Sequence, residues 1–241
     1  MVTGGAKIGG RALKRKVRSL LGGPDLDSAL AQIRRLPPRQ VVNPLFSFFC
    51  SLDPMLKWRA VSAMGAVVAN LAAGEAEFAR VVMRRLMWSL NDESGGIGWG
   101  APEAMGEIMA RSRTLADEFG AILLSYLQPQ GNNYLEHALL QRGLLWGLGR
   151  LAHVSPLRVR PAASGLLPFL GSPDPFHRGL AAWTAGALAW DGFREPLKAL
   201  CDDAALLEIY CRGRLQPTSV GDLAREALQL ADGPRKPAGK S

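Results

Sequence analysis

The chain has 241 residues, of which 48% are apolar and 21% charged, with a formal net charge of +8. This composition is typical of a globular protein with a sizeable core and is too apolar for a disordered chain. The charge belongs to the ends: residues 1–39 hold nine basic and two acidic groups, residues 232–241 hold three and one, and the 192 residues between them hold 17 and 18. The balanced body weakens the case for a nucleic-acid-binding protein.

Membrane and secretory signals are not found in the sequence. The longest charge-free apolar stretch, between Arg59 and Glu75, has 15 residues, whereas a membrane span needs about 18. The N-terminus carries positive charges but no apolar run after them, as a secretory signal would. Three cysteines match no metal spacing and suit a reducing compartment. We therefore expect a cytoplasmic protein without a transmembrane segment.

The chain is predicted to have three parts. Residues 1–26 form a basic, flexible segment, residues 27–231 an α-solenoid, and residues 232–241 a basic, disordered tail. Within the first part, residues 11–21 could also form a basic amphipathic helix, with Leu13, Val17, Leu20 and Leu21 on one side. A solvated tail is favoured, and nucleic acid or an anionic membrane is the alternative partner of this basic N-terminus.

Helix pairs follow one another along the solenoid. Asp53-Pro54 and Asp174-Pro175 place a capping acceptor and a first-turn proline at two helix starts. Asn43-Pro44 and Ser155-Pro156 are similar, and Ser219 with Asp222 has the spacing of a capping box. With apolar residues recurring every three or four positions, these signals predict a helix near 27–36 and the pairs 44–51 with 54–72, 75–90 with 100–110, 115–127 with 134–153, 157–171 with 175–190, and 196–212 with 219–231.

A repeat underlies these pairs. Residues 46–66 and 167–187 match without a gap at an offset of 121, and two intermediate copies place a glycine in the same position. The equivalent glycines are Gly65, Gly106, Gly149 and Gly186, separated by 41, 43 and 37 residues, and Ala227 takes the position in a weaker fifth copy. A period near 40 is typical of stacked helical repeats. Because glycine is unfavourable inside a helix, we expect it to mark close contact between helices.

The period, the Asp-Pro helix starts and the glycine-containing core resemble HEAT-like repeats, including those of phycobilisome-lyase-like proteins. Residues 91–108, NDESGGIGWGAPEAMGEI, also resemble a signature of uncharacterised bacterial HEAT-repeat proteins. The resemblance covers roughly residues 40–231. It implies an all-α fold, an α-solenoid of about five HEAT-like helix pairs, and a binding surface lined by the second helix of each pair. It implies no particular activity.

Aligning the glycines places three rows of residues across the second helices. The first row is Trp58, Trp99, Arg142 and Gly179, the second Ser62, Glu103, Trp146 and Trp183, and the third Ala66, Glu107, Arg150 and Ala187. Positions four residues apart share one side of a helix, and tryptophan and arginine are common anchors of recognition surfaces. The predicted binding groove is therefore Trp58, Trp99, Glu103, Glu107, Arg142, Trp146, Arg150 and Trp183. In the alternative interpretation, the tryptophans are packing residues and Glu107 and Arg150 form a structural ion pair.

The segment 91–100 is a second candidate. It contains four glycines but lacks the following Lys-Ser/Thr of a P-loop and follows no strand. Asn91, Asp92 and Glu93 could ligate a hard cation, although a flexible turn is the favoured interpretation. The three histidines share no ligand spacing, so no metal and no cofactor are predicted.

A non-enzymatic binding or scaffold protein is the leading hypothesis, with a protein, a peptide or a small ligand in the groove. The alternative is a DNA-alkylation-repair-type glycosylase of the helical-repeat class. By resemblance, Trp99, Glu103, Arg142 and Trp183 would correspond to its concave-face residues, with Glu103 stabilising a cationic nucleoside. This sequence departs from that class by having glutamate where those enzymes have aspartate, and by lacking a basic body. A lyase-like protein that attaches or removes a bilin is a third option, by fold analogy alone.

Overall fold

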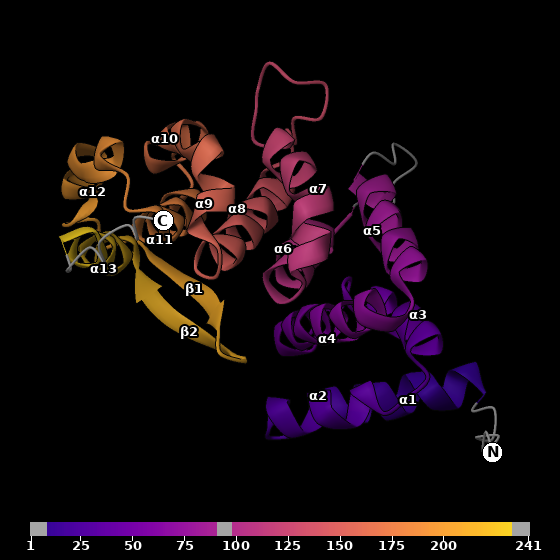
Figure 1. Ribbon diagram of the computed structural model, residues 1–241. Coiled ribbons are helices and arrows are strands. Elements are labelled where there is room, and N and C mark those ends of the chain that lie inside the picture. The colour runs from indigo at the N-terminus through magenta and orange to yellow at the C-terminus, as the bar shows by residue number, and fades with distance from the viewer. Residues whose placement is uncertain (1–8, 91–97, 233–241) are drawn as a thin grey trace. The chain divides into compact units, whose positions relative to one another are not determined.

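The computed structural model describes residues 9–90 and 98–232, and the chain divides into two compact units whose boundary falls inside helix α7 (Figure 1). Unit 1 runs to residue 116 and includes residues 212–214, and unit 2 holds the rest of the chain. The elements of unit 1 are α1 (Gly10–Leu21), α2 (Leu26–Arg34), α3 (Pro38–Phe48), α4 (Pro54–Gly74), α5 (Ala76–Leu90) and α6 (Ala101–Arg111).

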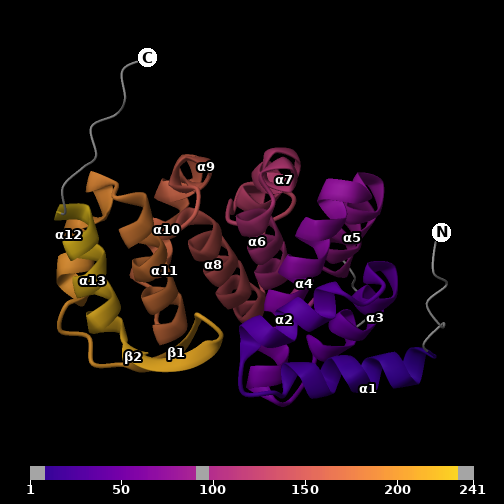
Figure 2. The same ribbon diagram turned by 60° about the horizontal axis from the view of Figure 1, so that its bottom comes forward.

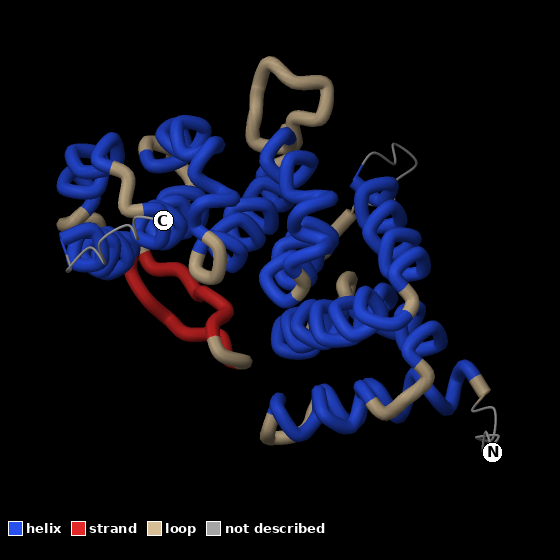
Figure 3. The backbone as a smooth tube through the Cα atoms, viewed as in Figure 1, coloured by secondary structure: helices blue, strands red, loops and turns tan. Residues whose placement is uncertain are grey.

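Unit 2 contains most of α7 and the elements that follow it, apart from residues 212–214 at the hairpin turn. They are α7 (Arg113–Ser125), α8 (Ala138–Ala152), α9 (Pro156–Val159), the 3-10 turn η1 (Arg160–Ala162), α10 (Ala163–Leu170), α11 (Pro175–Leu188), η2 (Asp191–Phe193), α12 (Arg194–Leu200), β1 (Leu206–Cys211), β2 (Arg214–Ser219) and α13 (Val220–Asp232). The one sheet among the described residues is the β1–β2 hairpin (Figure 3). The all-α class predicted from the sequence is confirmed. No described helix combines the length and apolar character that a membrane crossing requires.

Several predicted helix starts are confirmed by their capping bonds. The Asp53 carboxylate accepts the backbone N–H groups of Met55 and Leu56 at the start of α4. Asp174 accepts the N–H of Phe176 at the start of α11. Ser219 accepts the N–H of Asp222 at the start of α13. Each bond satisfies a first-turn donor that the helix itself cannot satisfy.

Other predicted helix boundaries are wrong. Helix α3 begins at Pro38, so Pro44 lies inside it. Helix α8 begins at Ala138, where the His137 ring accepts the N–H of Leu139, four residues later than predicted. The single helix expected over 157–171 is divided by η1, in which Pro161 stands. A proline cannot donate the backbone bond that an uninterrupted α-helix would need there.

The helix predicted over 196–212 is also wrong, because α12 ends at Leu200 and a hairpin follows. Side chains of β1 alternate between exposed and buried at its start, as on a half-buried strand. The turn residues Arg212 and Gly213 have φ values of 49° and 80°. Positive φ at both central positions is the mark of a two-residue type I′ turn, whose twist suits a hairpin.

Residues 10–21, assigned to a flexible segment from the sequence, form helix α1 along one side of unit 1 (Figure 2). Leu13, Val17 and Leu21 are 1%, 0% and 1% exposed, which matches the amphipathic alternative except that Leu20 lies at the margin of the buried side. The division into a flexible start, a solenoid and a tail stays a prediction. Of the tail, residues 233–241 lie outside the described residues.

The second helices of each unit pack against one another through the repeat glycines. A Cβ atom on Gly65 of α4 would lie 2.5 Å from the Glu107 Cγ atom of α6. In unit 2, a Cβ on Gly149 of α8 would lie 2.4 Å from the Trp183 ring of α11, and one on Gly186 of α11 would lie 2.8 Å from the Ala227 Cα atom of α13. Real Cβ atoms do not approach so closely, so these helices can meet only at glycine.

Candidate binding face on the second helices

In unit 1, the N-terminal end of the face formed by α4 and α6 is built around Lys57. Its Nζ atom donates to the Glu103 Oε1 atom at 3.1 Å and lies 5.5 Å from the centre of the Trp58 ring. Lys57 therefore connects an aromatic ring of α4 with a carboxylate of α6 through an ion pair and a cation–π contact. The Lys57 side chain is 27% exposed, so this end of the face can be reached from solvent.

Glu103 itself is 3% exposed. Its second carboxylate oxygen, Oε2, is buried and has no hydrogen-bond partner among the described residues. A buried acceptor without a donor costs about 1–3 kcal/mol, and more when it is charged. Such an atom is uncommon in folded proteins and requires an explanation. It leaves one acceptor for a donor that the described part of the chain does not supply.

Glu107, one turn further along α6, is 2% exposed and accepts a bond from the Arg111 Nε atom of the same helix. Its side chain also fills the space beside Gly65. Glu107 is thus a packing residue of the α4–α6 contact as well as an ion-pair partner. The predicted pair of Glu107 with Arg150 would join the two units and stays a prediction.

Trp99 lies just before α6 and is 38% exposed. The following residue, Gly100, has a φ of 77° and caps α6, and a Cβ at this position would lie 2.8 Å from the Phe49 side chain. A left-handed conformation and this close approach both require glycine. The backbone at Gly100 thus fixes the position of Trp99 relative to the start of α6. Asn91, Asp92 and Glu93 lie outside the described residues.

In unit 2, the second row is an aromatic cluster. The rings of Trp146 and Trp183 are stacked, with centroids 6.4 Å apart and planes at 26°. The Trp146 Nε1 atom donates to the main-chain carbonyl of Tyr210 in β1 at 2.9 Å, and the Tyr210 ring lies 6.2 Å away. Trp146 is therefore only 3% exposed. The alignment of the repeats correctly places Trp146 and Trp183 next to each other.

Strand β1 covers this face of unit 2. Its Leu207 side chain packs where a Cβ on Gly179 of α11 would lie, 2.6 Å from the Leu207 Cδ1 atom. Figure 1 and Figure 2 both show the hairpin alongside α11. Gly179 and Trp146 belong to the first and second predicted rows, so the chain's own strand occupies positions that the sequence assigns to a ligand.

Arg142, from the first row, pairs with the start of the next second helix. Its Nε atom donates to the Asp174 Oδ2 atom at 2.8 Å, and its guanidinium lies over the Phe176 ring. Partial burial raises the pKa of Asp174, but the bonds from Arg142 and the Phe176 N–H, with the charges of His177 and Arg142, outweigh it and lower the pKa overall. Asp174 thus caps α11 and joins it to α8.

His153 lies three residues after Arg150, the third-row residue of α8. It is the C-terminal cap of α8 through its backbone N–H, and the centre of its ring lies 4.6 Å from that of the Trp183 ring. Desolvation of the ring lowers the pKa of His153, although the residue as a whole is exposed; a backbone hydrogen bond to Trp183 raises it, and the Arg150 charge lowers it. The ring is therefore held toward its neutral form. Arg150 is partly exposed.

The predicted groove residues divide between the two units. Trp58, Trp99, Glu103 and Glu107 belong to unit 1, and Arg142, Trp146, Arg150 and Trp183 to unit 2. Within each unit the structure links members of the set as described above. The residues proposed for a glycosylase combine both units, so that arrangement stays a prediction.

Sequence reasoning missed the residues that complete these contacts, namely Lys57, Arg111, His153, Asp174 and Tyr210. For two of them the sequence contained a clue. Lys57 directly precedes the first-row residue Trp58, and Asp174 was predicted to cap the second helix that follows the one carrying Arg142. Tyr210 could have been found only by predicting the hairpin. In the described part of the chain, no three His, Cys, Asp or Glu side chains gather as a metal site would require.

Comparison with known structures places the fold. An engineered protein solved as a structural-genomics target has a TM-score of 0.51 at 16% identity, covering 91% of this chain and 96% of its own. A designed armadillo repeat protein, YIII(Dq.V1)4CPAF in complex with the peptide (KR)4, has a TM-score of 0.50 at 17% identity, covering 91% and 99%. Neither a protein-family model nor a curated protein matches the sequence. The chain thus has the helical-repeat, α-solenoid fold that its sequence predicts.

Proposed function

We propose that this chain is a non-enzymatic binding protein with HEAT-like repeats, and that the α4–α6 face of unit 1 holds a peptide segment of a partner protein. The observation that carries the proposal lies in unit 2. There, an extended strand is seated on the equivalent face, and a row tryptophan, Trp146, donates to the strand's main-chain carbonyl at Tyr210. Second helices of this repeat therefore can bind extended backbone.

Unit 1 has complementary groups at the corresponding place. Trp99 is 38% exposed, Lys57 is partly exposed, and the Glu103 Oε2 atom lacks a donor among the described residues. A main-chain N–H or a basic side chain of a peptide is the donor that this oxygen requires. Because Oε2 is shielded from water, a peptide would reach it only when the side chains around it move.

The designed armadillo neighbour offers an analogy, since it is in complex with the peptide (KR)4. Its basic side chains are donors of the kind that an unpaired carboxylate oxygen accepts. The analogy extends only to a peptide ligand. Unit 1 carries 18 basic and nine acidic groups, so a uniformly basic peptide would be repelled by the rest of the unit. We expect a mainly neutral segment with one basic residue or an exposed main-chain N–H.

Selection from a random peptide library displayed on phage tests this proposal. The whole protein is the target, and recovered peptides are synthesised and their affinities measured by fluorescence anisotropy. We expect Trp99→Ala to weaken binding by about 10-fold or more, as loss of an aromatic anchor does. Glu103→Gln removes the negative charge while keeping the size of the side chain, and should also weaken binding.

The matched control is Trp88→Ala. Trp88 is the other strongly exposed tryptophan of unit 1, at 73%, and lies on α5, outside the row positions. Peptides that depend on Trp99 and Glu103 but not on Trp88 would support the proposal. A failure to recover peptides, or peptides that bind the Trp99→Ala and wild-type proteins equally, would overturn it.

A further inference from the structure

Helix α1 presents a stripe of basic side chains, hereafter the basic stripe, made of Arg11, Lys14, Arg15 and Arg18. These residues are spaced i, i+3, i+4 and i+7, which places them on one side of the helix. All four are exposed. The stripe extends for about 10 Å, since each residue advances the helix by about 1.5 Å. It is the most concentrated run of positive charge on any described helix.

Among the described residues, no acidic side chain pairs with the basic stripe. Helix α1 contains no aspartate or glutamate. Within residues 9–90 and 98–232, the structure gives none of the four side chains an ion pair, and Lys14 instead lies over the Phe48 ring with its Nζ atom 5.5 Å from the centre. By contrast, Arg80 and Arg84 of α5 pair with Glu77, and Arg85 donates to the Asn43 side chain. The charge of the stripe is thus available to an external anion.

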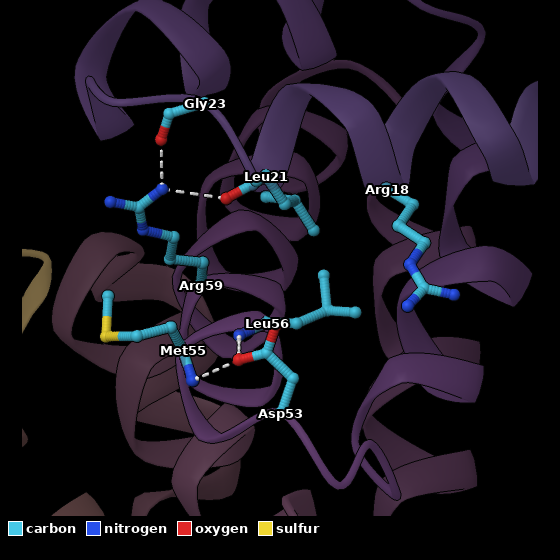
Figure 4. A pocket seen from close by; sticks show the side chains of 8 residues that line it. Arg18, Leu21, Gly23, Asp53, Met55, Leu56 and Arg59 are labelled. Atoms are coloured by element: carbon cyan, nitrogen blue, oxygen red, sulfur yellow. Dashed lines mark hydrogen bonds between the residues drawn. The ribbon is translucent and has the colours of Figure 1, made fainter.

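The stripe leads into a pocket of about 310 Å³ between α1 and α4 (Figure 4). Arg18 lines one side of it and Arg59 the other, with Leu21 and Leu56 between them. The Arg59 Nη1 atom donates to the carbonyls of Leu21 and Gly23, which fixes its guanidinium in place. The pocket therefore combines one immobilised guanidinium with one that belongs to the basic stripe.

Electrostatics of the pocket favour an anion. The Arg59 Nε atom is buried and has no acceptor among the described residues. The pocket also lies at the N-terminal, positive end of the 21-residue helix α4. Its one acidic group, Asp53, already accepts the Met55 and Leu56 N–H groups at the helix cap. Two guanidinium groups and a helix end thus outweigh a single engaged carboxylate.

The geometry points to the phosphate backbone of a nucleic acid duplex as the occupant: we propose that the basic stripe follows successive phosphates and that Arg18, at the edge of the pocket, holds the last of them, while Arg59 adds a fixed positive charge from the opposite side. Three of the four stripe residues are arginines, whose planar guanidinium groups bind phosphate through two parallel bonds. Duplex DNA supplies a rigid row of phosphates over the length of the stripe. No base-reading group is implied.

A lipid membrane fits these observations less well. An amphipathic helix binds a bilayer by inserting its apolar side, but that side of α1 is buried in the protein, where Leu13, Val17 and Leu21 are at most 1% exposed. Lipid headgroups also form a flat surface, whereas the basic stripe ends at a pocket that a flat surface would not fill. This surface is separate from the α4–α6 face, so the inference does not depend on the proposed function.

Binding of the whole protein to a fluorescently labelled DNA duplex, measured by anisotropy over a range of salt concentrations, tests the inference. Four phosphate contacts predict that log K falls with log salt with a slope of about −3.6, at about 0.9 per phosphate. Arg11→Gln with Arg15→Gln should reduce the slope by about 1.8 and weaken binding about 10-fold or more at low salt. Both residues are exposed, so the fold should survive.

The matched control is Arg160→Gln with Lys198→Gln, which removes the same charge from exposed positions of unit 2. This control should bind DNA as the wild type does. Equal loss in the control would show attraction by net charge alone and would overturn the inference. Unaltered DNA binding by the stripe variant would also overturn the inference. If that variant instead lost binding to phosphatidylserine vesicles, measured in parallel, the stripe would be a lipid-binding surface.

Discussion

In unit 2, the second-row positions of α8 and α11 hold stacked tryptophans under strand β1, whereas in unit 1 the same positions of α4 and α6 hold Ser62 and Glu103, and Glu103 is paired with Lys57. Both faces begin from the same repeat and the same glycine contact. Unit 2 supplies the occupant of its face from its own chain. Unit 1 leaves an acceptor of Glu103 without a donor among the described residues. The same repeat can thus have its second-helix face covered by a strand of its own chain, as in unit 2, or left uncovered by such a strand, as in unit 1.

The largest effect is expected at the glycine contact of unit 2. An alanine at Gly186 would place its Cβ 2.8 Å from the Ala227 Cα atom, and a backbone atom cannot move aside by a change of rotamer. We expect Gly186→Ala to lower the free energy of unfolding by about 1–3 kcal/mol through overpacking. Gly120→Ala is the control, because no atom lies within 4 Å of that added Cβ, and it should raise the stability by up to about 1 kcal/mol. Urea unfolding of both variants measures the difference, and the same sign for both would contradict the contact.

The next effect concerns the strand on unit 2. Trp146→Phe keeps an aromatic ring but removes the Nε1–H donor to the Tyr210 carbonyl. We expect a loss of about 1–3 kcal/mol and faster hydrogen exchange in β1 and β2. Trp183→Phe leaves that bond intact and should leave exchange in the hairpin much less affected. Equal exchange rates in the Trp146→Phe and wild-type hairpins would show that the bond does not hold the strand.

The smallest effect is the pH dependence contributed by His153, since that residue as a whole is exposed. Desolvation of its ring lowers the pKa of His153 below its ordinary 6.5, so the unfolded chain takes up a proton first as the pH falls. Stability is therefore full above about pH 6.5 and decreases as the pH falls through the folded pKa. In thermal unfolding at pH 8 and at pH 5.5, His153→Asn should show a smaller loss than the wild type. An identical loss in both would assign the pH dependence to other groups.

The second helices, and which of them are neighbours, could be predicted from the sequence because a glycine that recurs inside helices usually marks a close contact between them. Gly65, Gly149 and Gly186 each stand where two second helices meet. The same alignment brought Trp146 and Trp183 together correctly. Asp53 and Asp174 were identified as caps because a short acceptor before proline has few other roles at a helix start.

The hairpin could not be predicted as readily, because its strands are short and contain few β-branched residues. Only Gly213 and the alternation around Leu207 indicated it, and Pro217 in β2 is tolerated because a two-stranded sheet leaves each strand with an unpaired edge. Partners such as Lys57 and Tyr210 depend on tertiary distances that a repeat alignment does not contain. The occupant proposed for the unit 1 face would likewise belong to a second molecule, which the sequence of this chain does not contain.

Hydrogen–deuterium exchange of the whole protein, with and without a peptide selected from the library, tests the central claim most directly. Bound peptide should slow exchange over the start of α4 and over α6, near Lys57 and Glu103, and leave α8 unchanged beneath its strand. Protection of α8 or of the hairpin, with α4 and α6 unaffected, would contradict the assignment of the binding face to unit 1.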